Sequence, residues 1–244
     1  MTQGTLHVVS TPIGHLDDLT LRAIRLLGEV AVVAAEDPQQ TKVLFDHHGI
    51  ETPITSYHNG NKEAKAEVLV AYLKEGKSVA LVVDAGTPAV VDPGHYLIEQ
   101  AIAAGLRVSP VPGPSAVLAA LAVSGLSGDS FLFAGMLPRG PKSMQRFVSA
   151  LKTERRTLVM LADPASRVRT ILASITKVLG NRRVVLAKDL TTVQEECLRG
   201  QADRVLARLD SRPWTEALTI VVEGWKPRRD IRGRPKVRRR NASG

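Results

Sequence analysis

Short apolar runs alternate with amphipathic segments of helical length through the first half of the chain. We expect strands at the apolar runs, near Leu6–Ser10, Val30–Ala34, Ile54–Ser56, Val79–Val83 and Arg107–Pro110. We expect helices at the amphipathic segments, near Leu19–Leu27, Gln40–His48, Lys62–Glu75, His95–Ala104 and Ser115–Val123. Alternation of this kind is typical of parallel strands joined by crossover helices, so the pattern predicts an α/β domain with a parallel sheet.

The regular alternation of apolar and amphipathic segments ends at about Leu126. Strands are expected near Phe131–Ala134, Thr157–Leu161, Arg183–Ala187, Cys197–Arg199 and Leu218–Glu223, and helices near Ser143–Lys152, Arg167–Leu179 and Ala202–Asp210. This less regular order predicts a second α/β domain with a mixed sheet. A Pro/Gly cluster places the boundary near Pro114, which gives domains at 1–114 and 115–224.

The net charge of +9 is concentrated at the end of the chain. From Trp225 onward nine cations accompany only one anion, Asp230, so residues 225–244 carry eight of the nine net charges. With few apolar residues, this segment is expected to be a disordered basic tail that binds a polyanion. A merely solubilising end, or an anionic membrane surface, is the alternative. Aromatic residues make up only 4% of the chain, so RNA binding would depend on charge and shape.

Several classes of protein lose support. The single cysteine, Cys197, excludes an intrachain disulfide framework and suits a reducing compartment. The N-terminus lacks a signal-peptide pattern, and the longest apolar run, Ala116–Val123, is too short to span a bilayer. We therefore expect a soluble cytoplasmic protein. Glycine-rich dinucleotide and nucleoside-triphosphate motifs are missing, and the six histidines show no zinc-site spacing, so no metal is predicted.

Three Gly- and Pro-rich loops follow predicted strands, at Ser10–His15, Asp84–Pro88 with Asp92–Gly94 close behind, and Pro110–Ala116. Ligands of open parallel sheets bind outside the carboxyl ends of the strands. One such loop usually does no more than connect two elements, but three together favour a ligand site.

Motifs along the chain carry a family resemblance. In order they read GTLHVVSTPIGHLDDLTLRA, AAED, SYHNGN, LVVDAGTPAVVDPG, VPGPSAVLAAL, FLFAGMLPR, EECLRG and IVVEG. From Gly4 to Gly224 the chain resembles the ribosomal RNA small subunit methyltransferase I family of the tetrapyrrole-methylase superfamily. The resemblance implies a two-domain class III methyltransferase, usually a homodimer, that binds S-adenosylmethionine between its domains. It also implies methylation of a cytidine ribose 2′-hydroxyl in small-subunit rRNA.

The resemblance also assigns cofactor-binding positions. They are Pro12, Asp84, Ala85, Gly86, Thr87, Pro88, Pro112, Gly113, Ser115, Ala116, Leu161 and Ala217. Glu36 and Asp37, at the end of the second predicted strand, are candidates for the general base or for orienting the ribose. Adjacent carboxylates are also common at helix N-termini, and that alternative stays open.

Departures from the family pattern lie on the side expected to meet RNA. They are His15, Pro38-Gln39, Ala162–Ser166 and Lys188-Asp189 with Thr192 and Gln194. Three functions therefore remain open: an RNA ribose methyltransferase, a relative acting on a tetrapyrrole precursor or a protein, and a non-catalytic ribosome-binding or RNA-binding protein.

Overall fold

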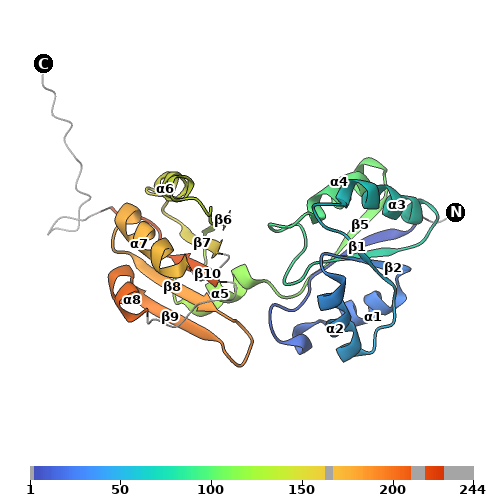
Figure 1. Cartoon of the computed structure of the whole chain (residues 1–244), viewed down its shortest axis with the longest axis horizontal. Helices are drawn as coiled ribbons and strands as arrows, with labels where there is room; N and C mark the ends of the chain where they lie inside the picture. The colour runs from blue at the N-terminus through green and yellow to red at the C-terminus, as the bar shows by residue number, and fades with distance from the viewer. Residues whose placement is uncertain (1–2, 163–166, 210–217, 228–244) are drawn as a thin grey trace, which may run out of the picture. The chain divides into compact units, whose positions relative to one another are not determined.

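A computed structural model describes residues 3–162, 167–209 and 218–227 (Figure 1). The chain forms two compact units. The first unit comprises Met1–Val123 together with Ala187–Cys197, and the second comprises Ser124–Leu186 and Leu198–Gly244. No helix among the described residues combines the length and apolar character needed to cross a bilayer.

The first unit is built on a five-stranded sheet in the order β3-β2-β4-β1-β5. Its strands are β1 (Thr5–Val9), β2 (Val32–Ala35), β3 (Ile54–Ser56), β4 (Val79–Val82) and β5 (Arg107–Val111). Every neighbouring pair is parallel, which confirms the predicted parallel sheet. Because β1 and β4 are neighbours at its centre, the loops that follow them emerge side by side at one edge.

Helices cover both faces of this sheet, as Figure 1 shows with α1 and α2 opposite α3 and α4. These helices are α1 (Leu21–Glu29), α2 (Pro38–His48), α3 (Lys62–Lys74) and α4 (Gly94–Ala103), and a further helix, α5 (Ala116–Ser124), follows β5. Alternate strand residues enter two separate cores: Val33 packs with α1 and α2, whereas Val32 packs with α3 and α4. The observed bounds differ from the predicted ones by at most two residues, and those of β3 coincide; a short 3-10 helix, η1 (Leu16–Asp18), was not predicted.

The second unit contains a mixed sheet in the order β6-β7-β10-β8-β9. Its strands are β6 (Phe131–Met136), β7 (Thr157–Ala162), β8 (Arg183–Lys188), β9 (Glu196–Gln201) and β10 (Leu218–Val222). β6 is parallel to β7 and β10 is antiparallel to it, so the prediction of a mixed sheet is confirmed. Three helices share one apolar core with the sheet, namely α6 (Pro141–Ala150), α7 (Val168–Leu179) and α8 (Ala202–Arg208).

The division between the units differs from the predicted boundary near Pro114. The Pro/Gly cluster there joins β5 to α5, and the first unit continues to Val123. The segment Ala187–Cys197, which spans the connection from β8 to β9, also belongs to the first unit. A break in hydrophobic pattern at Pro114 therefore marks a loop inside a unit, and a later part of the chain completes that unit.

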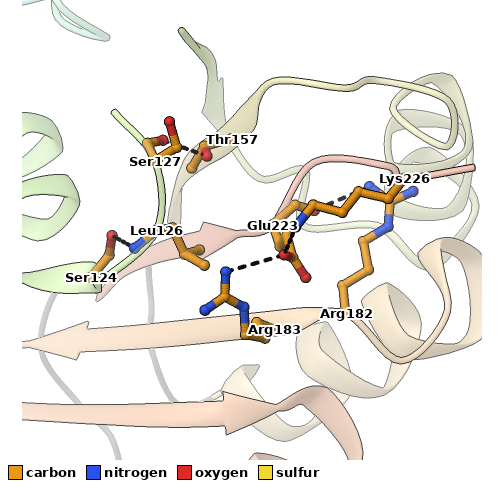
Figure 2. Close-up of polar contacts among 8 residues, drawn as sticks. All are labelled: Ser124, Leu126, Ser127, Thr157, Arg182, Arg183, Glu223 and Lys226. Atoms are coloured by element: carbon orange, nitrogen blue, oxygen red, sulfur yellow. Dashed lines mark hydrogen bonds and ion pairs between the residues drawn. The ribbon is translucent and has the colours of Figure 1, made fainter. Parts of the chain in front are cut away.

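A polar cluster fixes the chain where β10 ends (Figure 2). The Arg182 guanidinium is buried and donates hydrogen bonds to the carbonyl oxygens of Leu179, Lys152 and Glu223. The Glu223 carboxylate pairs with Arg183 at 3.2 Å and with Lys226 at 2.6 Å. The chain is therefore held in place as far as Lys226, whereas most of the predicted basic tail, residues 228–244, lies outside the described residues.

Candidate functional site

A pocket of about 360 Å³ lies within the first unit at the carboxyl ends of β1 and β4. The loop after β1, the loop after β4 and helix α2 form its walls. Its lining residues are Thr11, Pro12, Ile13, Gly14, Leu16, Gln40, Thr41, Val43, Leu44, Val83, Asp84 and Ala85. Small-molecule sites have volumes in this range and, in parallel sheets, this position.

Main-chain and side-chain hydrogen bonds join two of the predicted loops. Thr11 and Gly86 exchange both of their backbone hydrogen bonds, at 2.9 and 3.1 Å. The buried Thr11 hydroxyl also donates to the Val83 carbonyl oxygen at 2.9 Å. The loop after β1 and the loop after β4 consequently form one rigid edge of the pocket.

Thr87 connects the third loop to this edge. The Thr87 hydroxyl lies 2.9 Å from the Ser10 hydroxyl and donates to the Pro114 carbonyl oxygen at 3.3 Å. A Cβ at Gly113 would lie only 3.1 Å from the Cβ of Ser10, so glycine permits this close approach. The three loops that the sequence singled out are thus brought together.

Gly86 gives the loop after β4 a buried turn with a positive φ. Its φ is +88°, a conformation that glycine adopts readily, and an added Cβ would meet only Ile13 Cγ2, at 3.7 Å. The neighbouring Asp84 and Ala85 are exposed. A ligand can therefore reach this loop at Asp84 and Ala85, which line the pocket.

Three acidic residues, Glu36, Asp37 and Asp84, meet where β2 and β4 end. Burial, followed by the charges of Asp84 and Asp92, raises the pKa of Glu36 above its ordinary value. Burial also raises the pKa of Asp84, and the charge of Asp37 adds to this effect. The cluster is thus short of compensating positive charge, which suits a cationic ligand.

Asp37 has a clear local role as the N-cap of α2. One of its carboxylate oxygens accepts hydrogen bonds from the amides of Gln39 and Gln40, at 2.8 and 3.4 Å. Pro38 follows at the first helical position, where a missing N–H costs nothing. The geometry matches the helix-capping alternative for Asp37, while Glu36 makes no comparable cap.

Asp92 holds the far end of the loop that begins at Asp84, a role that the motif did not reveal. Its carboxylate accepts hydrogen bonds from the amides of Ala89, Val90 and Gly94 at 2.9, 2.9 and 2.7 Å. Ala89 and Val91 have φ values of 69° and 74°, which are unfavourable for residues with a Cβ. Strained backbone of this kind often accompanies functional sites. The DPG triplet was the available signal, but only the structure shows which amides the carboxylate binds.

The returning segment Ala187–Cys197 packs on the loop after β1. The His15 amide donates to the Thr191 hydroxyl at 2.9 Å. A Cβ on Gly14 would lie 2.6 Å from the Leu190 carbonyl oxygen, so this position has room only for glycine. The departures at His15 and at Lys188-Asp189 therefore fall beside one wall of the pocket, a juxtaposition that the sequence did not predict.

The remaining predicted positions lie in several places. Pro12 and Ala85 line the pocket, whereas Pro88, Pro112, Ser115 and Ala116 lie on the connected loops or at the start of α5. The Ser115 hydroxyl accepts a hydrogen bond from the Leu118 amide at 3.4 Å. Leu161 lies on β7 of the second unit, opposite Thr219 of β10. Ala217, and most of the Ala162–Ser166 departure, lie outside the described residues.

Sequence comparisons place this pocket in a family context. The family described as Tetrapyrrole (Corrin/Porphyrin) Methylases matches residues 5–206. "Ribosomal RNA small subunit methyltransferase I" of Thermotoga maritima is 38% identical over 221 residues, which cover 91% of this chain and 99% of that protein. The protein of the same name from Pseudomonas aeruginosa is 42% identical over 231 residues, covering 93% and 81% of the two chains.

Solved structures agree on the fold. A conserved hypothetical protein from Aeropyrum pernix has a TM-score of 0.68 at 20% identity, covering 91% of this chain and 85% of its own. Uroporphyrin-III C-methyl transferase from Thermus thermophilus, complexed with S-adenyl homocysteine, has a TM-score of 0.61 at 22% identity and covers 89% and 97%. At such identities the likeness shows the fold alone, whereas the sequence relatives and the matched residues 5–206 identify the family. The chain therefore belongs to the ribosomal RNA small subunit methyltransferase I family of tetrapyrrole methylases.

Proposed function

We propose that this protein uses S-adenosylmethionine to methylate RNA of the small ribosomal subunit, at the ribose 2′-hydroxyl of a cytidine. The observation that carries the proposal is the pocket at the carboxyl ends of β1 and β4, built from the loops with the family motifs. The two relatives named above support rRNA as the acceptor. The ribose position is the finer part of the proposal and comes from the family resemblance.

The residues of the pocket fit such a cofactor. Pro12 and Ala85 offer apolar contact, and Gly86, which follows Ala85, is a proposed cofactor contact. Asp84, which lines the pocket, provides negative charge for the sulfonium and ammonium groups of the cofactor. When bound, S-adenosylmethionine supplies an electrophilic methyl group on a positively charged sulfur. Thr87, Pro88, Pro112, Gly113, Ser115, Ala116, Leu161 and Ala217 remain proposed cofactor contacts.

Glu36 is our candidate for the base that removes the proton from the ribose hydroxyl. Its raised pKa makes the carboxylate a stronger base than an ordinary glutamate. It follows β2 directly and interacts with Asp84, so it lies at the pocket edge. Asp37, with one oxygen bound to the amides of α2, is better placed to position this edge than to accept a proton.

Partners and location follow from the same proposal. Substrate rRNA places the protein in the cytoplasm with the ribosomes, and the homodimer implied by the family resemblance remains a prediction. Light scattering on the purified chain would measure the mass of the assembly.

The decisive experiment incubates the purified full-length chain with labelled S-adenosylmethionine and either small ribosomal subunits or their free rRNA. Label should enter RNA, and mass analysis of a nuclease digest should find 2′-O-methylcytidine. A Glu36→Gln variant should lower kcat at least tenfold while its affinity for S-adenosylhomocysteine stays unchanged.

The other outcomes would name a different function. Transfer to a tetrapyrrole precursor or a protein, with none to RNA, would reject an RNA acceptor. Cofactor-independent RNA binding without any methyl transfer would favour a non-catalytic protein.

A further inference from the structure

The two units carry charges of opposite sign. The first unit holds nine Lys or Arg residues and sixteen Asp or Glu residues. The second unit, counted without residues 228–244, holds sixteen Lys or Arg and only seven Asp or Glu. The near neutrality of residues 1–224 thus arises from cancellation between an acidic unit and a strongly basic one. Positive charge is a property of the folded second unit as well as of the tail.

The surface helices show where this difference lies. Helices α1 to α4 of the first unit carry six Lys or Arg and five Asp or Glu, and they form i,i+4 pairs such as Arg25–Glu29 and Lys42–Asp46. Helices α6, α7 and α8 of the second unit also carry six cations, but only one anion, Asp203. The balance of cations and anions thus differs between the helices of the two units. A general need for solubility would not explain why only the helices of the second unit carry so few anions.

These three helices form a continuous layer, which we call the basic helix layer. α7 packs between α6 and α8, and the apolar faces of all three enter the core of the second unit. The opposite faces are exposed and carry Lys142, Arg146, Arg169, Lys177, Arg204 and Arg208. Neighbouring helix axes typically lie about 8–10 Å apart, so three helices span several phosphates of a nucleic-acid strand.

Most cations of the basic helix layer have no anionic partner. Within the described residues no ion pair involves any of the six, although the Arg169 guanidinium donates to the carbonyl oxygens of Leu206 and Leu209. Arg169 therefore ties α7 to α8, while Lys142, Arg146 and Lys177 make no recorded side-chain hydrogen bond. Their charges are available to a ligand.

The described helices of the layer expose no large hydrophobic side chain. Among the described residues of the second unit, the one exposed large hydrophobic side chain is Met136 on β6, outside these helices. Protein interfaces usually have an apolar centre, and membrane-binding helices insert an apolar face. Phosphate backbones, in contrast, are bound by Lys and Arg side chains alone.

We propose that the basic helix layer of the second unit binds the phosphate backbone of the substrate RNA. This inference rests on the proposed function for the choice of RNA, and it assigns part of RNA binding to α6, α7 and α8 rather than to the tail. The first unit, with its excess of acidic residues, attracts the same backbone less than the second unit does. The acidic pocket and the RNA-binding charge are thereby assigned to different parts of the chain.

The test compares two full-length variants that change net charge equally. One removes three cations from the layer, as Lys142→Gln, Arg146→Gln and Lys177→Gln; the control removes three from the first unit, as Arg25→Gln, Lys62→Gln and Lys74→Gln. Fluorescence anisotropy measures binding to a labelled fragment of small-subunit rRNA over a range of KCl concentrations. Each lost phosphate contact should reduce the slope of log K against log salt by roughly 0.7–0.9.

The layer variant should therefore lose about two units of slope, and its affinity near 0.1 M KCl should fall tenfold or more. The control should stay within about twofold of the wild type. Unchanged thermal unfolding and unchanged binding of S-adenosylhomocysteine would show that both variants remain folded. Equal effects in the two variants, no effect in the layer variant, or no RNA binding by the wild type would overturn the inference.

A binding measurement with lipid vesicles distinguishes an RNA ligand from a membrane surface. The proposal would also be overturned if the wild type bound phosphatidylserine vesicles and the layer variant lost this vesicle binding but kept its RNA binding. Methyl transfer is measured independently, so RNA binding by the layer can fail while the proposed function stands, and the reverse also holds.

Discussion

The backbone amide of Asp37 donates a hydrogen bond to Oδ1 of Asp84 at 3.0 Å, which joins the end of β2 to the loop after β4. Because the Asp37 carboxylate caps α2 at the same time, Asp84 is linked through one residue to the first turn of that helix. The charged edge of the pocket is therefore held by backbone groups on both sides. Substitutions at Asp84 can separate the role of its charge from the role of its hydrogen bond.

Asp84→Asn retains an oxygen that can accept the Asp37 amide but removes the negative charge, whereas Asp84→Ala removes both. We expect both variants to bind S-adenosylmethionine at least tenfold more weakly, with a smaller loss for S-adenosylhomocysteine, which lacks the charged sulfur. Thermal unfolding should change less in Asp84→Asn than in Asp84→Ala. Calorimetric titration with both compounds measures the difference. Equal losses for the two compounds would show that Asp84 does not respond to the sulfonium charge.

The raised pKa of Glu36 predicts how stability depends on pH. The native state binds this proton more tightly than the unfolded chain, whose value is near 4.5, so the contribution of Glu36 to stability falls as pH rises through the raised native pKa. Glu36→Gln should therefore be more stable than the wild type at pH 7. The difference should vanish below about pH 4, where both states are protonated. Unfolding curves at several pH values provide the measurement, and a difference independent of pH would contradict the assignment.

Asp92→Ala should damage the pocket as well as the loop. Three amides lose their acceptor, and Ala89 and Val91 keep φ values that cost roughly 1–2 kcal/mol each. We expect a lower unfolding temperature and about tenfold weaker binding of S-adenosylhomocysteine.

Thr20→Ala is the matched control for Asp92→Ala, because Thr20 caps α1 by accepting the Ala23 amide and does not line the pocket. It should cost about 1 kcal/mol of stability without changing cofactor affinity. Adding Ala89→Gly to Asp92→Ala should restore part of the binding, since glycine tolerates a positive φ. If cofactor affinity followed stability alone in all three variants, Asp92 would have no role in positioning the pocket.

A truncation of the tail should begin after Pro227. The Trp225 amide donates to the Glu154 carbonyl oxygen at 2.6 Å, and Lys226 pairs with Glu223, so cutting before Trp225 would disturb the second unit (Figure 2). Removing residues 228–244 should weaken RNA binding and flatten its salt dependence, with cofactor affinity unchanged. Combined with the layer variant, the losses should add, since the contacts are separate. Loss of cofactor binding on truncation would contradict this division.

Much of the fold was predictable because its elements have strong local signals. The strands of the first unit are short, the central strands β2 and β4 are buried on both faces, and the order of strands and helices implied a parallel sheet. The capping of α2 by Asp37 is likewise a local pattern. The boundary at Pro114 and the charge separation were not predictable, because the first unit is discontinuous in sequence and a sum over residues 1–224 cancels its acidic residues against the basic second unit.

The pocket was predictable as a set of loops but not as a set of contacts. Glycine at position 86 indicated an unusual backbone, and the structure gives it a φ of +88°. In contrast, the sequence could not show that Asp92 binds three amides or that a Cβ is excluded at Gly14. Both features depend on contacts that are made only in the folded chain. The raised pKa of Glu36 likewise requires its burial and its acidic neighbours, which only the folded chain defines.

The return of Ala187–Cys197 to the first unit has a consequence for biosynthesis. A ribosome that has produced residues 1–123 has not yet made the segment whose Thr191 binds the His15 amide and whose Leu190 packs on Gly14. The support behind Gly14, a pocket-lining residue, thus becomes complete only after residue 197 has emerged. A nascent or prematurely terminated chain that ends before this point lacks the segment that packs against the loop after β1, so this loop reaches its final packing only when most of the protein has been translated.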